Sequence, residues 1–158
     1  MQASDILPRL TTRSFGKTLF PHELLDSTNL TAKTLASEGA PEGAVVIADR
    51  QRAGRGRLGR RWESEAGNLT FSLILRPLIS PDRLGLLSLY ASLAVAQGVE
   101  AFTGLKPNCK WPNDLLLAAK KFCGILSEGV FNGPDLASVV VGIGINVNQD
   151  SFPEHLAD

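Results

Sequence analysis

The sequence predicts an α+β fold in which a mixed, mostly antiparallel sheet is backed by helices. Three observations lead to this prediction: several short apolar runs with strand periodicity, one long apolar stretch with helical periodicity, and turn signals between neighbouring strands. The chain has 158 residues, enough for one domain with its own core and short for two. Its 44% apolar and 20% charged residues exclude a disordered chain. We therefore expect one domain over residues 1–158.

The first elements are a strand and a short helix. Residues 19–26 predict a strand that leads into Ser27 and Thr28, either of which is a good N-cap. The helix then covers about residues 29–37 and is closed by Gly39.

Two strands and a long helix follow. Residues 44–48 form a compact apolar strand, and residues 69–75 alternate with period two, as in a strand with one buried face. Pro81 opens a helix that extends to about Phe102. One face of this helix carries Leu84, Leu87, Ala91, Ala94, Val95 and Val99, while Leu86, Leu89 and Leu93 lie elsewhere on its surface. We expect it to pack against the sheet on one side and against a partner element on another.

The rest of the chain predicts strands over about residues 108–111, 114–118, 122–131 and 136–145. Asn132-Gly133-Pro134-Asp135 is a turn signal that joins the last two as a hairpin. The sequence contains no repeats, no low-complexity tract and no linker.

Positive charge is concentrated in one place. Six of the ten arginines lie in residues 50–61, here called the arginine segment, which has no acidic residue and directly precedes Trp62. The whole chain nets zero, with 16 basic and 16 acidic residues, so the basicity belongs to a local site and disfavours a general nucleic-acid coat. Three glycines disfavour a helix or a flat strand, and we expect a mobile cationic loop. Such a loop beside an indole suits a polyanion that carries a flat ring, such as a nucleotide.

Other features exclude several classes of protein. Cys109 and Cys123 have no CxxC spacing and no paired histidines nearby, so we predict neither a metal site nor a disulfide framework. Residues 1–17 lack the apolar core of a secretory signal. The most apolar run, residues 84–96, has 13 residues, short of the ~20 that cross a bilayer. We expect a cytoplasmic protein without a membrane partner.

The arginine segment admits three interpretations. It could be a solvated basic turn, or an RNA contact, although no second basic patch or aromatic platform accompanies it. The third is anion chemistry. When a carboxylate attacks a phosphate, guanidinium groups offset the repulsion and match the oxygens in bidentate geometry. The glycines let backbone N–H groups approach the ligand, and Trp62 offers a surface for a nucleobase.

Three further segments carry candidate residues. Residues 110–114 end in a polar Asn-Asp pair, either as an Asx turn or with Asp114 as a contact to a ligand or to Mg²⁺. Lys121 precedes an apolar strand, either as a lysine whose stem lies along apolar surface or as a side chain facing a ligand. Gly124 within that strand indicates the close approach of a ligand or another backbone. Residues 142–146 carry a GxG pattern without the third glycine of a dinucleotide site, and no Walker A pattern occurs.

Together these segments resemble the catalytic domain of the biotin–protein ligases, also called biotin–[acetyl-CoA-carboxylase] ligases. The matching elements, in the family's order, are Ser27-Thr28-Asn29, Gln51, Gly54-Arg55-Gly56-Arg57-Leu58-Gly59-Arg60-Arg61-Trp62, Lys110-Trp111-Pro112-Asn113-Asp114, Lys121-Phe122-Cys123-Gly124-Ile125-Leu126 and Gly142-Ile143-Gly144-Ile145-Asn146. The resemblance implies the class II synthetase-like fold of the biotin and lipoate ligases. It also implies two half-reactions with Mg²⁺: biotin and ATP give biotinyl-5′-AMP, and a lysine of a biotin carboxyl carrier protein, such as that of acetyl-CoA carboxylase, then takes the biotinyl group.

The resemblance also assigns binding roles. Ser27, Thr28 and Gln51 resemble the family's contacts to the biotin ureido head and its surroundings, and Asn29 of the same motif is a further ligand-binding candidate. The wall around the biotin ring and its valeryl chain is formed by Gly54, Arg55 and Gly124. The contacts on the nucleotide side are Trp62, which stacks on adenine, with Asn113 and Asn146.

Three residues are assigned to the chemistry by the same resemblance. Lys121 faces the junction of carboxylate and phosphate and is the foremost catalytic candidate. Arg57 holds the intermediate and limits its escape. Asp114 lies near the phosphates, in metal binding or in activation of the acceptor lysine. The arginine segment is expected to order over biotinyl-AMP and to shield it from water.

Two departures from the family shape the remaining expectations. Only 26 residues precede Ser27, too few for the helix-turn-helix domain of the repressor relatives, so we expect no DNA binding. The chain stops 12 residues after Asn146, where relatives continue into further catalytic-domain residues and a small β-barrel. The alternatives are a lipoate–protein ligase, whose Arg-Arg-x-Ser-Gly-Gly-Gly loop is absent, and a truncated biotin or nucleotide binder without full transfer activity. A homodimer is left open.

Overall fold

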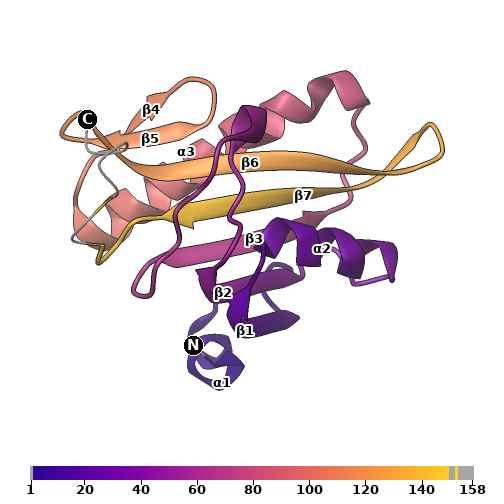
Figure 1. The fold of residues 1–158 in the computed structure, drawn as a ribbon, viewed down its shortest axis with the longest axis horizontal. Coiled ribbons are helices and arrows are strands. Elements are labelled where there is room, and N and C mark those ends of the chain that lie inside the picture. The colour runs from indigo at the N-terminus through magenta and orange to yellow at the C-terminus, as the bar shows by residue number, and fades with distance from the viewer. Residues whose placement is uncertain (1, 150–151, 153–158) are drawn as a thin grey trace.

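The computed structural model describes residues 2–149 and 152, and it confirms the predicted α+β architecture. One seven-stranded sheet forms the centre, with the order β1-β2-β3-β7-β6-β5-β4 (Figure 1). The strands are β1 (Leu19–Leu25), β2 (Val45–Gln51), β3 (Leu69–Leu75), β4 (Asn108–Lys110), β5 (Asp114–Leu117), β6 (Lys120–Asn132) and β7 (Asp135–Ile145). β1 and β2 are parallel and all other neighbours are antiparallel, so the sheet is mixed as predicted.

The helices are α1 (Ala3–Ile6), α2 (Thr28–Ser37) and α3 (Leu84–Thr103), with 3₁₀ turns η1 (Leu7–Arg9), η2 (Arg57–Gly59) and η3 (Pro81–Arg83). The predictions of α2, α3 and the β6–β7 hairpin are confirmed. α1 and η1 escaped prediction because so short a helix shows no periodicity. α3 ends at Gly104, whose φ of 74° favours a residue without a Cβ.

The two faces of the sheet have different coverings, because successive side chains of a strand point to opposite faces. On one face, Val139, Val141 and Ile143 of β7 belong to the core cluster that packs against α3. On the other, Val140 belongs to the cluster that packs against α2. α2 packs mainly on β3, β2 and β7 and reaches β6 through fewer contacts. The rest of that face, over the first half of β6 and the end of β7, is left for a site.

The buried line of α3 differs from the prediction. Among the expected inner residues, Ala94 is exposed. The deepest positions are instead Ser88, Ser92 and Ala96, spaced by four residues. Their small size lets the helix approach the sheet, and Ser88 Oγ donates to Ser127 Oγ of β6 at 2.9 Å. Apolar periodicity missed this line because two of its members are polar.

The observed length of α3 also changes the expectation that no apolar segment is long enough to cross a bilayer. With η3 it forms a helical stretch of 23 residues, Pro81–Thr103, in which an 18-residue window has a mean hydropathy of 1.3. By length and composition alone this stretch, unlike the 13-residue run, is sufficient to cross a bilayer. That is weak evidence for a membrane span, because a helix that covers a sheet passes the same test. Its inner line packs in the core, while Leu86, Tyr90 and Leu93 are exposed.

The arginine segment contains regular hydrogen bonding in addition to its glycines. Its two sides pair with each other: Trp62 N donates to the Gly54 carbonyl at 3.0 Å, and Gly56 N donates to the Arg60 carbonyl at 2.8 Å. Residues 54–62 thus form a narrow hairpin-like loop, called the arm below, which the 3₁₀ turn η2 closes. Leu58 at its tip is 87% exposed with a φ of 55°. In Figure 1 the arm runs across the face of β7 and β6 that α2 leaves open.

Candidate active site under the arginine segment

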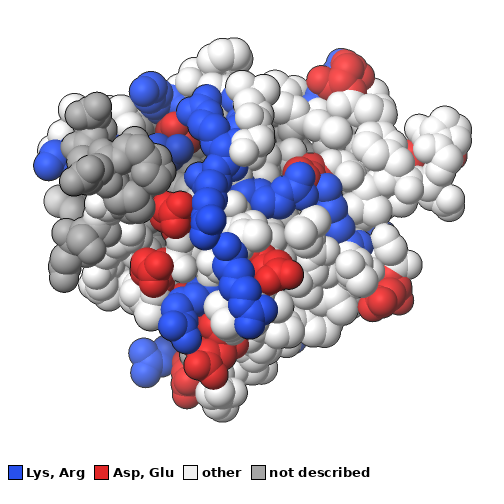
Figure 2. All heavy atoms as spheres, viewed as in Figure 1, with Lys and Arg blue, Asp and Glu red and all other residues white. Residues whose placement is uncertain are grey.

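A pocket of about 570 Å³ lies between the arginine segment and the open face of the sheet. That volume is in the range of small-molecule sites. All the segments that the sequence singled out contribute to its lining. Lysine and arginine side chains form a band across this face of the molecule (Figure 2). The basic residues that line the pocket are Arg55, Arg57, Arg60, Arg61, Lys110 and Lys121.

On the floor of the pocket the Trp62 indole packs directly on two glycines, Gly124 and Gly144, called the glycine seat below. Gly124 of β6 pairs directly with Gly144 of β7. A Cβ on Gly144 would lie 2.4 Å from Trp62 Cε2, and a Cβ on Gly124 would lie 3.0 Å from Trp62 Cζ3. Both distances are shorter than an ordinary carbon contact, so only glycine allows the ring to lie this close to the strands. Gly54 supports the same residue from the arm, because a Cβ there would lie 2.3 Å from the Trp62 carbonyl oxygen.

Lys121 is held in the pocket by two partners. Its Nζ lies 2.8 Å from Asp114 Oδ1, an ion-pair distance whose angles fall outside those of a hydrogen bond. The same Nζ lies 5.8 Å from the centroid of the Trp62 ring, within the range of a cation–π contact. The lysine side chain is 42% exposed, whereas that of Asp114 is 19% exposed. A positive group therefore faces the pocket and remains accessible to an anion.

Asn113 connects the arm to the sheet. Its Nδ2 donates to the Ile125 carbonyl at 2.9 Å, and its Oδ1 accepts from Arg57 at 3.2 Å. Both partners of the side chain lie in other elements, so neither bond is that of an Asx turn, and Asn113 and Asp114 both line the pocket. Trp111, beside the cis Trp111–Pro112 bond, is 78% exposed and does not share the seat of Trp62.

The opposite end of the pocket is the N-terminus of α2. Ser27 occupies the N-cap position and is buried, but its side chain makes no capping hydrogen bond, contrary to the expectation. Gln51 of β2 replaces the cap, because its Oε1 accepts from Thr28 N at 2.7 Å and contacts Thr28 Oγ1 at 3.1 Å. Ser27, Thr28 and Gln51 therefore lie side by side on the pocket wall.

Behind this wall lies a row of buried polar side chains. Ser72 Oγ contacts Thr28 Oγ1 at 2.8 Å and donates to Asn29 Oδ1 at 2.6 Å. Asn29 Nδ2 donates to Glu128 Oε2 at 2.7 Å. A Cβ on Gly142 would lie 2.1 Å from Asn29 Oδ1, so this glycine makes room for the amide.

Two pocket atoms lack a partner among the described residues. Trp62 Nε1, a donor, and Asn146 Oδ1, an acceptor, are both buried without a hydrogen bond in that part of the chain. Buried polar groups normally have partners, so these two atoms are available to a bound ligand or to water. The backbone of Asn146 is fixed by its N–H, which donates to the Phe122 carbonyl at 2.7 Å.

Two titratable groups near the pocket have shifted pKa values. Burial raises the pKa of the Cys123 thiol from 9.0 to about 12, against the opposing effect of Lys121. Burial also works against ionisation of Glu128, but the hydrogen bonds from Lys33 and Asn29, with the charge of Arg55, outweigh it and hold the pKa of Glu128 below 4.5. Cys123 is thus a neutral core residue, and Glu128 is a carboxylate at neutral pH.

The described residues contain no group of three or more His, Cys, Asp or Glu side chains that could hold a metal ion. Mg²⁺ commonly binds through one or two carboxylates and substrate phosphates. Asp114 and Glu63 both line the pocket and provide that chemistry.

The structure gathers most of the predicted site residues. All the predicted site residues but Gly54 line the pocket, and Gly54 pairs instead with the backbone of Trp62. Their assigned roles stay predictions. Sequence reasoning missed Ser72 and Glu128, although the strand periodicity of β3 and β6 could have placed both on the face of the site.

Comparison with known proteins agrees with this geometry. Residues 22–146 match the biotin/lipoate A/B protein ligase family. The chain belongs to this family. It is 46% identical over 161 aligned residues to the bifunctional ligase/repressor BirA of Bacillus subtilis, covering 100% of this chain and 50% of that protein. It is 44% identical over 124 residues to the biotin–[acetyl-CoA-carboxylase] ligase of Paracoccus denitrificans, covering 77% of this chain and 51% of that one.

A solved structure agrees with the fold of this family member. The biotin protein ligase from Aquifex aeolicus in complex with biotin and ATP superposes with a TM-score of 0.76 at 39% identity. The match covers 90% of this chain and 57% of the Aquifex chain. The predicted class II synthetase-like ligase fold is confirmed. The present chain spans about half the length of the curated relatives that it matches.

Proposed function

We propose that this chain is the biotin- and ATP-binding part of a biotin–protein ligase and forms biotinyl-5′-AMP. The observation that carries the proposal is the convergence of a lysine, an arginine-rich arm and a tryptophan on a glycine seat around one pocket. The relatives are biotin ligases by name, and the Aquifex structure holds biotin and ATP. These names favour biotin over lipoate within a family that includes both.

In the proposed reaction a biotin carboxylate oxygen attacks the α-phosphorus of ATP. A new O–P bond forms, the bond to the β-phosphate oxygen breaks, and pyrophosphate leaves with the electron pair. Lys121 offsets the charge of the two approaching anions, and the Asp114 carboxylate keeps its ammonium group in place. Arg57 holds the arm over the intermediate through Asn113. Catalysis is therefore mainly positioning and charge stabilisation.

Trp62 provides the nucleotide subsite in this proposal. One face of its indole rests on Gly124 and Gly144, and the ring also lines the pocket. Stacking of adenine on such a ring is worth about 1–3 kcal/mol. Asn113 and Asn146 provide polar atoms on the same side.

Mg²⁺ enters with ATP in this scheme, as a substrate complex. Asp114 is the pocket carboxylate placed beside Lys121, and we propose that it helps to hold the ion or to activate the acceptor lysine. The second half-reaction transfers biotin to a lysine of a biotin carboxyl carrier protein. The name of the Paracoccus relative supports acetyl-CoA carboxylase as the source of that acceptor.

The decisive experiment incubates the chain with biotin, [α-³²P]ATP and Mg²⁺ and separates the products by thin-layer chromatography. We expect labelled biotinyl-AMP, and labelled transfer when a carrier domain is added in the tritiated-biotin version of the assay. Adenylate with lipoate but not with biotin would replace the assignment by lipoate ligation. Adenylate without transfer would limit the chain to the first half-reaction.

Lys121→Ala tests the catalytic assignment. We expect it to abolish adenylate formation while circular dichroism shows a retained fold. Lys120→Ala is the matched control, because this exposed neighbour on β6 lies outside the pocket lining. Normal adenylation by Lys121→Ala would remove Lys121 from the chemistry.

A further inference from the structure

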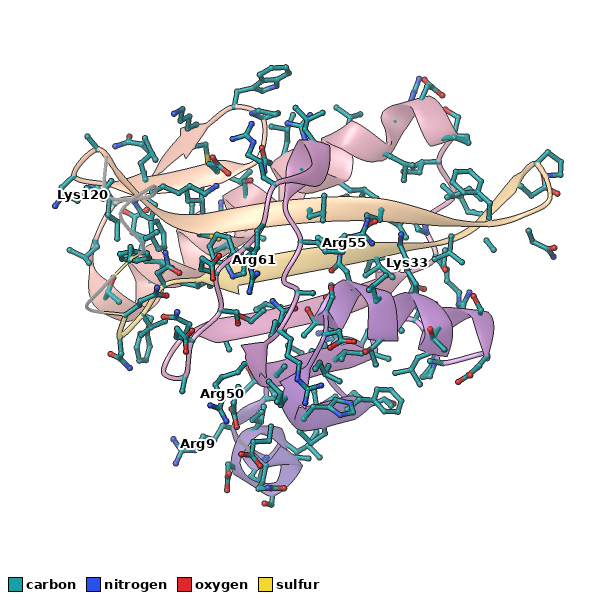
Figure 3. All side chains as sticks on the ribbon, viewed as in Figure 1. Arg9, Lys33, Arg50, Arg55, Arg61 and Lys120 are labelled. Atoms are coloured by element: carbon teal, nitrogen blue, oxygen red, sulfur yellow. The ribbon has the colours of Figure 1, made fainter. Side chains whose placement is uncertain are left out.

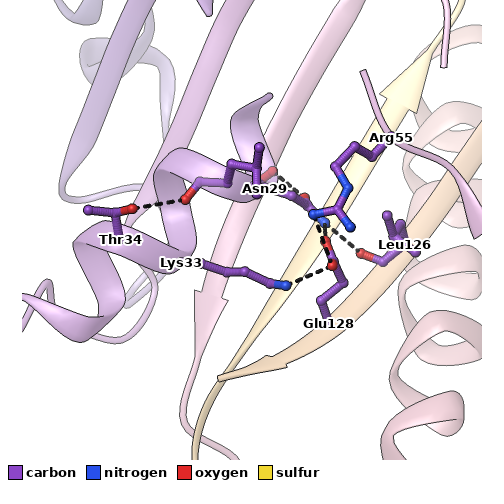
Figure 4. A network of polar contacts seen from close by, with 8 residues as sticks. Asn29, Lys33, Thr34, Arg55, Leu126 and Glu128 are labelled. Carbon is purple, nitrogen blue, oxygen red and sulfur yellow. Dashed lines mark hydrogen bonds and ion pairs between the residues drawn. The ribbon is translucent and has the colours of Figure 1, made fainter. Parts of the chain in front are cut away.

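Glu128 of β6 lies behind the pocket wall rather than in the pocket. Its side chain is only 16% exposed, yet it carries a charge. It contacts three side chains from two other elements (Figure 4). Lys33 Nζ of α2 lies 2.7 Å from Oε1, Arg55 of the arginine segment lies 3.5 Å from the same oxygen, and Asn29 Nδ2 donates to Oε2 at 2.7 Å. Arg55 and Lys33 are labelled near each other in Figure 3, and Figure 4 shows both directed at Glu128.

We propose that Glu128 is a positioning residue for biotin: it sets the hydrogen-bonding direction of the pocket wall and anchors the arginine segment. The proposal rests on the proposed function, since it concerns the biotin end of the same pocket. Glu128 acts through Asn29 and Arg55, both of which line the pocket, while Glu128 itself does not.

The available N–H and O–H protons determine which atoms of the pocket wall donate hydrogen bonds and which accept them. Asn29 Nδ2 donates to two acceptors, Glu128 Oε2 at 2.7 Å and the Leu126 carbonyl at 3.3 Å, so the amide oxygen must face Ser72. Ser72 has one hydroxyl proton, and Asn29 Oδ1 can only accept, so the proton points to Asn29. Ser72 Oγ also lies within donor distance, 2.8 Å, of Thr28 Oγ1, and the Thr28 hydroxyl itself donates to Gln51 Oε1 at 3.1 Å.

The consequence for the ligand is specific. With its proton directed at Gln51 Oε1, which also accepts from Thr28 N, Thr28 Oγ1 keeps a lone pair for the pocket. An oxygen acceptor at this position suits an N–H group of a ureido ring. A carboxylate is the only side chain that accepts from Asn29 and from both cations at once.

The amide of glutamine cannot replace Glu128, although it has the same shape. Glu128→Gln must turn its NH₂ group either toward Asn29 Nδ2, donor against donor, or toward Lys33 and Arg55, donor against cation. The first choice releases the Asn29 amide, and the second releases the arm. Either choice leaves buried polar groups without partners.

The test compares Glu128→Gln with Glu23→Gln. Glu23 of β1 also pairs with an arginine, Arg50 at 3.7 Å, but its side chain is 83% exposed and outside the pocket lining. For Glu128→Gln we expect the KM for biotin to rise about tenfold or more. The KM for ATP should rise by a clearly smaller factor than the KM for biotin, because Trp62 stays packed on Gly124 and Gly144. Trypsin should also cut the arginine segment faster than in Glu23→Gln.

Equal rises in both KM values, or a biotin KM like that of Glu23→Gln, would overturn the proposal while the proposed function stands. Absence of biotinyl-AMP from the wild-type chain would overturn the proposed function and this inference with it. If Glu128→Gln does not fold, Glu128→Asp takes its place, with the shorter stem expected to raise the biotin KM about threefold. The same two outcomes then decide.

Discussion

Replacing Gly144 by alanine tests the glycine seat directly. The new Cβ would lie 2.4 Å from Trp62 Cε2, 2.5 Å from Cζ2 and 2.6 Å from Nε1. An ordinary carbon contact is about 3.5 Å, so the indole must rise by about 1 Å. The strand backbone lies on one side of the ring and the pocket on the other, so we expect the ring to move into the space of the ligand.

Two opposing effects set the change in stability. Alanine in a strand is favoured over glycine by about 0.5–1 kcal/mol. Overpacking costs about 1–3 kcal/mol. We expect Gly144→Ala to lose about 1–2 kcal/mol of unfolding free energy. If the displaced ring also loses the stacking energy of a base, about 1–3 kcal/mol, the affinity for ATP falls by a factor of about 5 to 150.

The assays are urea denaturation for the unfolding free energy and isothermal titration calorimetry for ATP. Gly98→Ala in α3 is the matched control, because no atom lies within 4 Å of the added Cβ. It should stabilise the chain by about 0.5–1 kcal/mol and leave ATP affinity unchanged. If Gly144→Ala behaves like Gly98→Ala in both assays, the indole does not rest on β7 and the reasoning fails.

Three further results are expected. Iodoacetamide should label the exposed Cys109 in the native chain but spare Cys123, which is buried and, with a pKa of about 12, protonated. Mass spectrometry measures the labelling, and the denatured chain, in which both cysteines react, is the control. Arg76→Ala should cost about 2 kcal/mol of unfolding free energy, because its guanidinium donates to the Ala36 and Ala40 carbonyls at the end of α2, and an unchanged melting temperature would contradict this. The pKa of Glu128 is lower in the folded chain than its ordinary 4.5, so the ionised carboxylate contributes fully to the unfolding free energy above pH 4.5 and loses this contribution as the pH falls through the folded-state pKa. The difference in unfolding free energy between wild type and Glu128→Gln should therefore shrink between pH 6 and pH 3.

Local signals predicted much of the fold. Alternation over residues 69–75 placed β3, and the turn at residues 132–135 placed the β6–β7 hairpin. These predictions succeeded because each depends on neighbours along the chain. The inner line of α3 failed because Ser88 and Ser92 are buried by a close approach to the sheet that polarity along the helix does not report.

The candidate site divides in the same way. The sequence by itself determined which segments carry chemistry: the arginine segment, the lysine before β6 and the polar start of α2 each have a composition that stands out locally. Only the tertiary structure decided what the residues do to one another. In the sequence the GxG pattern at residues 142–144 is only weak evidence for a site. In the structure, Gly144 leaves room for Trp62 and Gly142 leaves room for Asn29, because both side chains pack on β7. Glu128 looks like an ordinary strand residue until α2 and the arm bring two cations to it. The physical reason is that close approach and charge pairing depend on distances across the sheet, which spacing along a chain does not contain.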